Sequence, residues 1–301
     1  MALSSRPVFR SDRSRAVLAL LVAAFVYGAT FVVIKTAIED FPPIAFVAWR
    51  FALGALALAL FAFPRGRKLW LHGLIVGFFL FAGYALQTAG LALTGAANSA
   101  LITGLYVVIT PLLASLLARQ APGWWISSAA ALSFAGLVLL TGTDDLDFKR
   151  GDLLTLGCAF AFACYILAVS RFARHHPVIP FTTVQLAVAA ALAFPVSYAL
   201  ESPGLPPQSV WAALALTAFG VSVGAFILQI WAQTIVGAST TAVVLAAEPA
   251  FGVATAWVVL GERLTLAAWG GALLILVAIF IVITKQEEQT WIEAEAVTPT
   301  H

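Results

Sequence analysis

Ten long apolar stretches, each about as long as a bilayer-spanning helix, run through the sequence from near its start to residue 284. A helix needs about 20 mainly apolar residues to cross the hydrocarbon core of a membrane. Strands of a membrane barrel would instead alternate apolar and polar residues with a period of two. The sequence therefore predicts an all-α integral membrane protein with ten transmembrane helices, at 16–38, 44–63, 69–93, 97–118, 124–142, 152–172, 180–200, 209–234, 238–260 and 266–284.

The composition supports this class of protein. Of the 301 residues, 62% are hydrophobic and 10% are charged, whereas soluble domains run at roughly 45–50% and about 25%. The net charge of +2 gives no strong field toward an anionic partner. These values exclude an ordinary soluble enzyme, a nucleic-acid-binding module and a disordered chain. The lipid bilayer is therefore the expected surrounding of most of the chain.

Basic residues indicate how the predicted helices are oriented. If the N-terminus is cytoplasmic, the segments on that side hold eleven Lys and Arg residues, and the outer loops hold only Lys149, Arg150 and Arg263. Short cytoplasmic loops of membrane proteins carry such an excess of basic residues. We therefore expect both termini in the cytoplasm, with 1–15 as an N-terminal segment and 285–301 as a tail.

The two halves of the chain show a weak similarity to each other. At an offset of 135 residues Arg50 aligns with Gln185, and at an offset of 142 residues Tyr106 aligns with Glu248. Five helices per half would invert the second copy in the membrane. We expect two inverted repeats, at 16–142 and 152–284, around a central cavity. In secondary transporters built this way, substrate binds near the midplane between the halves.

Glu248 is the one acidic residue predicted deep within a span, ten residues into the stretch 238–260. A carboxylate at a helix centre costs about 2.5–3.5 kcal/mol on insertion scales. One interpretation is a hydrogen-bonded structural group before the helix-bending Pro249. The other is a side chain that faces a wet cavity, where it binds a substrate ammonium or carries a proton.

Helical spacing places further polar and aromatic side chains toward the same predicted cavity. Gln87 shares one helix face with Tyr84, and Gln229 shares another with Phe226 and Gln233. A glutamine amide can hold a zwitterion through its donors and its acceptor, and interhelical hydrogen bonding is the alternative. The predicted cavity residues are Glu248, Gln87, Gln229, Tyr84, Tyr106, Asn98, Phe226 and Gln233.

Two basic residues within spans have a different expected role. Lys35 lies near the outer end of its helix, where it can reach headgroups or Glu39. Arg50 lies about seven residues, roughly 10 Å, below the outer surface. We expect both to be gating or structural charges, and the alternative for Arg50 is a substrate ligand. Neither the cysteines, six residues apart on one helix, nor the scattered histidines form a disulfide or metal-ligand pattern, so we expect no metal site.

Several short motifs follow one another in a characteristic order between residues 16 and 284. They are YGATF at 27–31 with Lys35 and FPP at 41–43 after it, WRF at 49–51, AANS at 96–99, EP at 248–249 and GERLT at 261–265. Because these motifs occur in this order, the chain resembles the EamA-type transporters of the drug/metabolite transporter superfamily. The resemblance implies a ten-helix exporter in a bacterial inner membrane, most similar to exporters of amino acids, aromatic ones included. RQAP at 119–122 departs from the family pattern, because the second half has GERL at the matching place.

We therefore expect a secondary transporter that exports amino acids or similar small amphiphilic metabolites by alternating access, without a cofactor. Proton coupling through Glu248 stays open, as does the oligomeric state. The alternatives are an exporter of drugs or other metabolites, a channel, and a non-transporting membrane scaffold. An intramembrane enzyme would need a nucleophile–base pair or metal ligands at depth, and the spans contain no such pattern. No catalytic residue is therefore expected, and the sequence has no P-loop for ATP.

Overall fold

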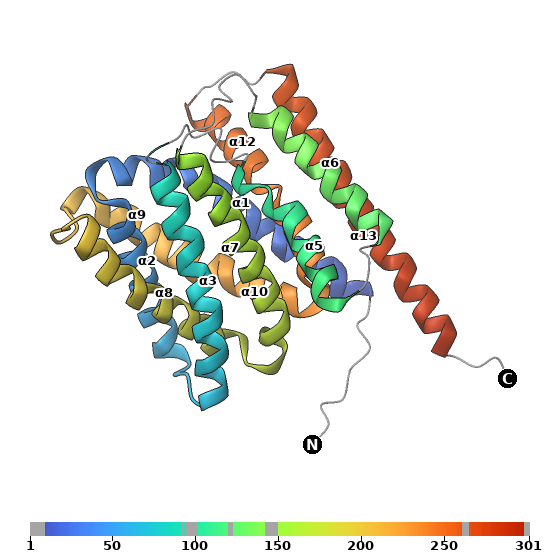
Figure 1. Ribbon diagram of the computed structural model, residues 1–301, viewed down its shortest axis with the longest axis horizontal. Helices are drawn as coiled ribbons and strands as arrows, with labels where there is room; N and C mark the ends of the chain where they lie inside the picture. Colours follow the sequence, from blue (N-terminus) through green and yellow to red (C-terminus); the bar gives the residue numbers. More distant parts are fainter. Residues whose placement is uncertain are drawn as a thin grey trace.

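The computed structural model describes residues 10–91, 93, 102–119, 123–141, 150–260 and 265–297. Throughout these residues the chain forms helices and short turns, without a strand (Figure 1). The prediction of an all-α protein is confirmed for this part of the chain. The helix α1 begins and the helix α13 ends toward the same end of the bundle, at the lower right of Figure 1.

The described helices differ widely in length, from single turns to more than thirty residues. Two short 3₁₀ turns, η1 and η2, join longer helices, and η3 is a π-helical segment within a longer helical run. In chain order the elements are α1 (Arg10–Asp40), α2 (Pro43–Phe61), α3 (Arg67–Leu91), α5 (Tyr106–Ala118), α6 (Trp124–Thr141), α7 (Arg150–Phe172), η1 (Ala173–His175), α8 (Val178–Leu200), η2 (Gln208–Val210), α9 (Trp211–Leu216), η3 (Thr217–Ala225), α10 (Phe226–Val236), α11 (Ala238–Leu245), α12 (Glu248–Leu260) and α13 (Leu266–Val297).

Seven helical segments of the described chain are long and apolar enough to cross a membrane, judged by length and composition. Two shorter apolar helices, Tyr106–Ala118 and Trp124–Leu140, accompany them. The segments agree with a multi-pass membrane protein, and the count of ten spans stays a prediction. The seven are Ser11–Thr30, Pro43–Phe61, Arg67–Gly90, Arg150–His175, Val178–Leu200, Gln208–Val236 and Leu266–Lys285.

Two of the predicted spans are interrupted rather than continuous. The stretch 238–260 forms α11 and α12, with a turn at residues 246–247 between them, and Glu248 is the first residue of α12. Pro249 explains the break, because its ring lacks an N–H and would clash with a carbonyl one turn earlier. A similar turn at residues 104–105 precedes α5, which begins at Tyr106. Hydropathy does not reveal either turn, because both are made of small or apolar residues.

Both ends of the described chain are helical beyond the predicted spans. The helix α1 starts at Arg10, six residues before the predicted first span, and α13 continues to Val297 instead of ending near residue 284. Charged and polar residues dominate both extensions. They can form helix outside the bilayer because helix formation needs only suitable propensity, while membrane crossing needs apolar side chains as well.

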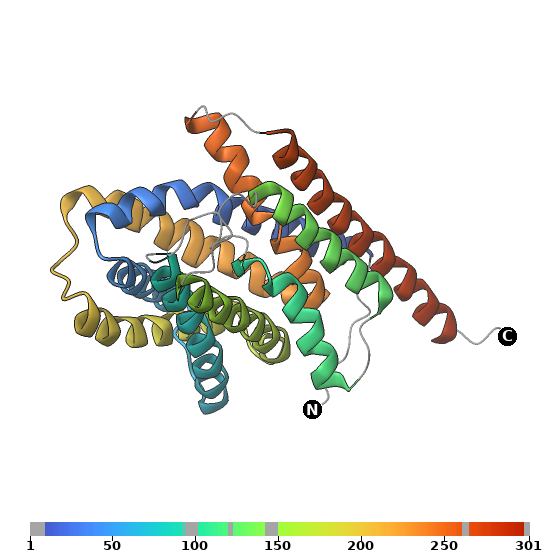
Figure 2. The same cartoon turned by 45° about the horizontal axis from the view of Figure 1, so that its top comes forward.

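Glycines allow the closest helix crossings. The helices α6 and α13 run side by side in both ribbon views (Figures 1 and 2) and meet at Gly136 and Gly271. A Cβ on Gly136 would lie 2.6 Å from the carbonyl oxygen of Gly271, and one on Gly271 would lie 2.6 Å from the Leu140 nitrogen. Small residues at crossings are typical of membrane helix packing, in which van der Waals contact holds helices together.

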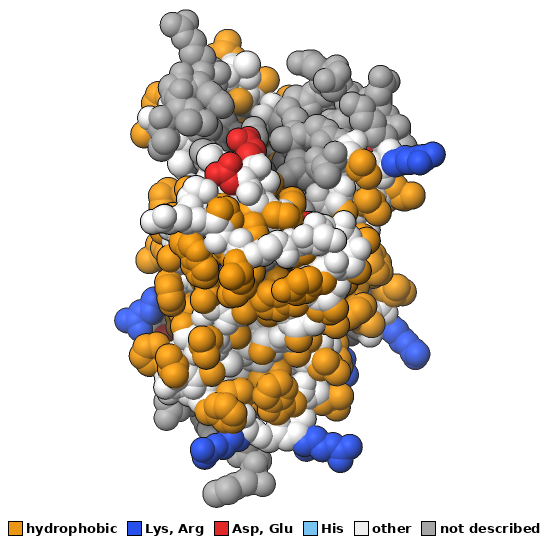
Figure 3. Space-filling model, turned by 90° about the vertical axis from the view of Figure 1, so that its left-hand side faces the viewer, with side chains coloured by type: hydrophobic (Ala, Val, Ile, Leu, Met, Phe, Trp, Pro, Cys, Tyr) orange, Lys and Arg blue, Asp and Glu red, His pale blue; other side chains and the backbone are white. Residues whose placement is uncertain are grey.

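Large hydrophobic side chains are exposed on the outside of the bundle. Leu60, Phe61 and Leu266 are 81%, 83% and 91% exposed. Figure 3 shows hydrophobic side chains over much of one face of the molecule, with Lys and Arg side chains at its lower edge and sides. Soluble monomers rarely expose contiguous apolar patches of more than a few hundred Å². This surface is therefore suited to contact with lipid.

Candidate functional site

Glu248 lies in the interior, where the chain resumes a helical course after the turn at residues 246–247. Its side chain is half-buried. As the first residue of α12 it stands at the positive end of a helix dipole, which stabilises a carboxylate. The middle of α1 crosses at this point through Gly28, where a Cβ would lie 2.7 Å from the nitrogen of Gly252 and would clash with the carbonyl of Glu248. The glycine therefore lets α1 pass directly over the start of α12.

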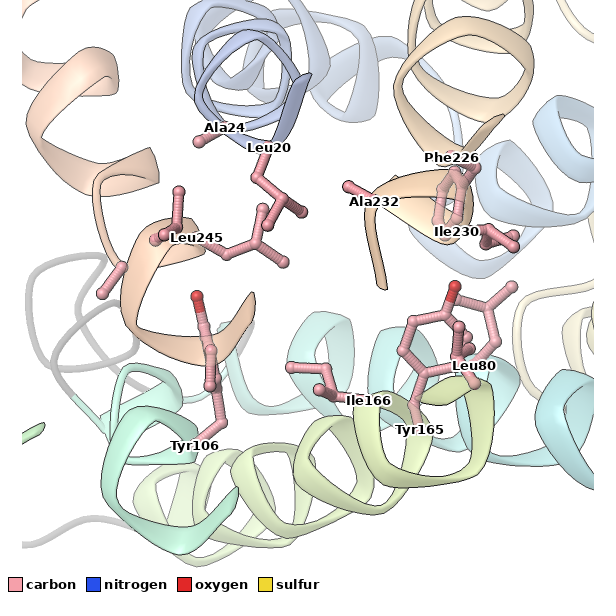
Figure 4. Close-up of a cluster of buried hydrophobic side chains, with 14 of the residues drawn as sticks. Leu20, Ala24, Leu80, Tyr106, Tyr165, Ile166, Phe226, Ile230, Ala232 and Leu245 are labelled. Atoms are coloured by element: carbon pink, nitrogen blue, oxygen red, sulfur yellow. The ribbon is translucent and has the colours of Figure 1, made fainter. Parts of the chain in front are cut away.

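Three tyrosines from three helices lie within electrostatic range of the Glu248 carboxyl group. Tyr27 of α1, Tyr84 of α3 and Tyr106 of α5 all interact electrostatically with it. Figure 4 shows the Tyr106 hydroxyl pointing from α5 into the interior, toward Leu245. Tyr106 also begins its own helix after a turn, as Glu248 does. Two predicted residues, Tyr84 and Tyr106, thus stand near Glu248.

An aromatic cluster continues from this group of tyrosines. The rings of Tyr27 and Phe226 are 5.7 Å apart, and those of Phe51 and Tyr84 are 5.2 Å apart, both edge to face. Phe226 also contacts Phe51 and Tyr165 at 6.3 Å, and Figure 4 shows Tyr165 and Phe226 beside each other from α7 and α10. Such aromatic pairs add about 0.5–1.5 kcal/mol beyond area burial. The predicted residues Tyr84 and Phe226 are joined through Phe51.

Gln229 and Gln233 belong to a chain of hydrogen bonds that ties α10 to its neighbours. The Tyr27 hydroxyl donates to Gln229 Oε1 at 2.7 Å, and Gln229 Nε2 donates to Gln233 Oε1 at 3.1 Å. Gln233 Nε2 then donates to the Ile166 carbonyl and to Ser170 Oγ, both at 3.0 Å. Buried amides in such a satisfied chain fix the positions of α1, α7 and α10.

The remaining predicted residues stand apart from this chain. Gln87 is half-buried on α3 and makes no hydrogen bond with another described residue. Asn98 lies outside the described residues, as does the side chain of Lys35. The structure thus places Gln229 with Gln233 and Tyr27, and the predicted pairing of Gln87 with Gln229 across a substrate stays a prediction.

Arg50 is buried in the middle of α2, with 2% of its side chain exposed. Its guanidinium carbon lies 4.7 Å from the ring centroids of both Phe51 and Tyr84. Two of its nitrogens, Nε and Nη2, have no hydrogen-bond partner in the described part of the chain. Cation–π contacts with two rings therefore hold the guanidinium beside the aromatic cluster.

Two features were missed by the sequence reasoning. Tyr27 and Tyr165 belong to the interior cluster but were not among the predicted cavity residues, although Tyr27 begins the YGATF motif. Their partners come from helices far away in sequence. His72 and His176, two of the histidines that are scattered in the sequence, approach to 2.8 Å between Nδ1 and Nε2. The search of the described residues for three or more metal-ligating side chains finds none, and both cysteines are free.

An apolar helical bundle with interrupted helices and charged side chains in its interior is characteristic of membrane transporters. The family model described as "EamA-like transporter family" matches residues 14–142 and again 149–284. The chain therefore belongs to the EamA-like transporter family. The general resemblance predicted from the motifs is confirmed.

Individual relatives agree with this assignment. An "Uncharacterized transporter" of Archaeoglobus fulgidus is 32% identical over 276 residues, which cover 88% of this chain and 84% of the relative. The "Uncharacterized transporter YyaM" of Bacillus subtilis is 30% identical over 233 residues, covering 71% and 76%. A solved crystal structure matches with a TM-score of 0.75 and 22% identity over 89% of this chain and 96% of that chain, which supports the fold alone.

Proposed function

We propose that this transporter exports small amphiphilic metabolites, amino acids and aromatic amino acids among them, across the bacterial inner membrane by alternating access. The observation that carries the proposal is Glu248 at the start of a half-helix in the interior, among Tyr27, Tyr84 and Tyr106. Broken helices whose ends face a central site are how secondary transporters bind polar substrates near the midplane. Glu248 then binds the substrate ammonium.

The aromatic cluster beside Glu248 supports an aromatic side chain on the substrate. The ring of Phe51 packs edge to face against the rings of both Tyr84 and Phe226, so the three rings form one aromatic surface. A flat apolar side chain gains both area burial and favourable ring geometry against such a surface. Gln87, whose amide is not engaged by a described neighbour, adds a donor and an acceptor on α3.

Two inverted repeats form the proposed framework for alternating access. The helices α5 and α12 begin 142 residues apart, as do α6 and α13, and this is the offset of the sequence repeat. The starts of α2 and α8 are 135 residues apart, which is the earlier offset. The two separate matches of the family model, to 14–142 and 149–284, also support the division. Rocking of one repeat against the other would expose the site to each side in turn.

A counterflow experiment tests the proposal. Purified protein is reconstituted into liposomes loaded with an unlabelled amino acid, and uptake of external labelled amino acid is followed over a panel of amino acids and unrelated amphiphiles. A carrier of amino acids shows uptake that the internal substrate stimulates, strongest for aromatic members of the panel. Uptake without trans-stimulation indicates a channel, and stimulation by the unrelated amphiphiles alone indicates an exporter of other metabolites. Either of these two results contradicts the proposal.

A further inference from the structure

Arg50 carries a charge whose hydrogen-bonding capacity is only partly used. The side chain is 2% exposed, yet Nε and Nη2 have no hydrogen-bond partner in the described structure. A buried cation in a membrane is costly and is retained where a partner or a ligand compensates for it. The rings of Phe51 and Tyr84, each 4.7 Å from the guanidinium carbon, hold the group in place without supplying a hydrogen-bond partner for Nε or Nη2.

The two unpartnered nitrogens lie on the same edge of the guanidinium plane. Nε–H and one N–H of Nη2 point in nearly parallel directions, and their spacing matches the two oxygens of a carboxylate. An arginine that only stabilised its helix contacts would have this edge paired within the protein or turned toward water. Among the described residues this edge has no hydrogen-bond partner, and the side chain is buried, as expected of a group that binds an anionic ligand.

The presence of Glu248 in the same region as Arg50 indicates which class of anionic ligand Arg50 could bind. Tyr27 and Tyr84 each interact electrostatically with both Arg50 and Glu248, so the four side chains belong to one part of the interior. Arg50, in the middle of α2, and Glu248, the first residue of α12, are the two charged side chains that interact with these tyrosines. One cation and one anion fit a zwitterion of zero net charge better than a phosphate, which would need more positive charge.

We propose that Arg50 is a substrate-binding residue that receives the carboxylate of the transported molecule on its Nε–Nη2 edge. This inference rests on the proposed function for the role of Glu248 at the ammonium end. Together the two residues specify a substrate with a carboxylate at one end of its polar part and an ammonium at the other. Phe51 and Tyr84 fix the guanidinium orientation from its faces.

Three ligands that differ in their charged groups test the assignment. L-phenylalanine has both groups, 3-phenylpropionate has only the carboxylate, and phenethylamine has only the ammonium. Binding of each to purified protein is measured by ligand-dependent thermal stabilisation, with wild type, Arg50→Gln and Arg50→Lys. Arg13→Gln, in the first turns of α1, is a matched control that removes an arginine outside the site.

In Arg50→Gln we expect the Kd of L-phenylalanine and of 3-phenylpropionate to rise about tenfold or more, while the Kd of phenethylamine changes by less than about twofold. Arg50→Lys keeps the charge without the two-point edge, so its loss for the carboxylates is intermediate. Should Arg50→Gln fail to fold, Arg50→Lys supports the same comparison. Arg13→Gln binds all three ligands like wild type.

Equal weakening of all three ligands, or unchanged binding of the two carboxylates, overturns the inference. Failure of wild type to bind either carboxylate overturns it as well. If 3-phenylpropionate follows the expected pattern and no amino acid undergoes counterflow, the carboxylate site stands and the proposed function fails. If L-phenylalanine undergoes counterflow and Arg50→Gln binds it normally, the proposed function stands and the carboxylate site fails.

Discussion

At the scale of single residues, Gln229 and Gln87, which align under the proposed repeat, have different surroundings. Gln229 accepts a hydrogen bond from Tyr27 and donates one to Gln233, and 3% of its side chain is exposed. Gln229→Leu would leave these two partners unsatisfied, which costs about 1–3 kcal/mol for a buried group. We expect it to lower the melting temperature in detergent.

Gln87→Leu is the matched substitution in the other half. Because Gln87 has no hydrogen-bond partner among the described residues, we expect its free energy of unfolding to change by less than about 0.5 kcal/mol. Transport should nevertheless weaken, since the amide is proposed to contact substrate. Equal destabilisation by the two substitutions would contradict the assignment of Gln229 to the hydrogen-bond chain. Normal transport by Gln87→Leu would remove Gln87 from the site.

The contact between His72 and His176 predicts a dependence of stability on pH. His176 lies between the membrane spans, and burial lowers its pKa from the ordinary 6.5, with His72 and His175 adding to the effect. The unfolded chain therefore binds more protons than the folded protein as the pH falls toward and below about 6.5. The stabilisation is present above this pH and is lost as the pH falls.

We therefore expect the melting temperature to fall from pH 7.5 to pH 5.5, and His176→Gln to reduce this fall. The substitution His175→Gln is the control, because the His175 side chain is exposed and lies outside the 2.8 Å contact. Thermal unfolding in detergent at several pH values gives the comparison. If His176→Gln keeps the full pH dependence, other groups are responsible for it.

At the scale of helices, the crossing of α6 and α13 depends on a glycine that faces the neighbouring helix. A Cβ on Gly271 would lie 2.6 Å from the Leu140 nitrogen, whereas a Cβ on the adjacent Gly270 meets nothing within 4 Å. Gly271→Ala should destabilise the protein by about 1–3 kcal/mol through overpacking. Gly270→Ala should be neutral or stabilising, because alanine favours helix by up to about 1 kcal/mol.

Denaturant or thermal unfolding of the two variants in the same detergent measures the difference. Similar stability of Gly271→Ala and Gly270→Ala would contradict this prediction, because it would show that α6 and α13 can move apart to accept a methyl group without a loss of stability. This pair of neighbouring glycines tests packing alone, since both sites have the same backbone and the same substitution.

Helices were easier to predict from sequence than their interruptions. The stretch 44–63 predicted α2, which spans Pro43–Phe61, because about 20 apolar residues are sufficient evidence for a span. The turns before Tyr106 and Glu248 escaped prediction, since the residues that form them are as apolar as the helices around them. Pro249 was a local signal for the second turn, but a proline can also bend a continuous helix.

The contents of the site were predictable only in part. A carboxylate within an apolar stretch drew attention to Glu248 because of its cost in a bilayer, and repeat spacing led from it to Tyr106. The partners of Gln233, in contrast, are the Ile166 carbonyl and Ser170, more than sixty positions away in the sequence. Helical spacing reports which residues share a face but not which helix that face meets.

At the scale of the whole molecule, the proposed topology has both termini in the cytoplasm. In a background without Cys158 and Cys164, a cysteine in place of Ser202 should react with an impermeant thiol reagent added outside intact cells. Ser202 is exposed and follows α8, on the predicted outer side. A cysteine in place of Ser11, also exposed and in the first turn of α1, should react only after the membrane is permeabilised. The reverse labelling pattern would contradict the ten-span topology.

Substrate exchange by Glu248→Gln, measured beside pH-driven net flux, tests the central claim that Glu248 binds the substrate ammonium during transport. The substitution keeps the shape of the side chain and removes its charge. Wild type and Glu248→Gln are reconstituted at equal amounts of folded protein. We predict that the variant loses affinity for amino acids, so that counterflow and net export weaken together. Preserved exchange with lost pH-driven flux would instead make Glu248 a proton carrier, and normal transport at reduced thermal stability would make it a structural group; either result contradicts the claim.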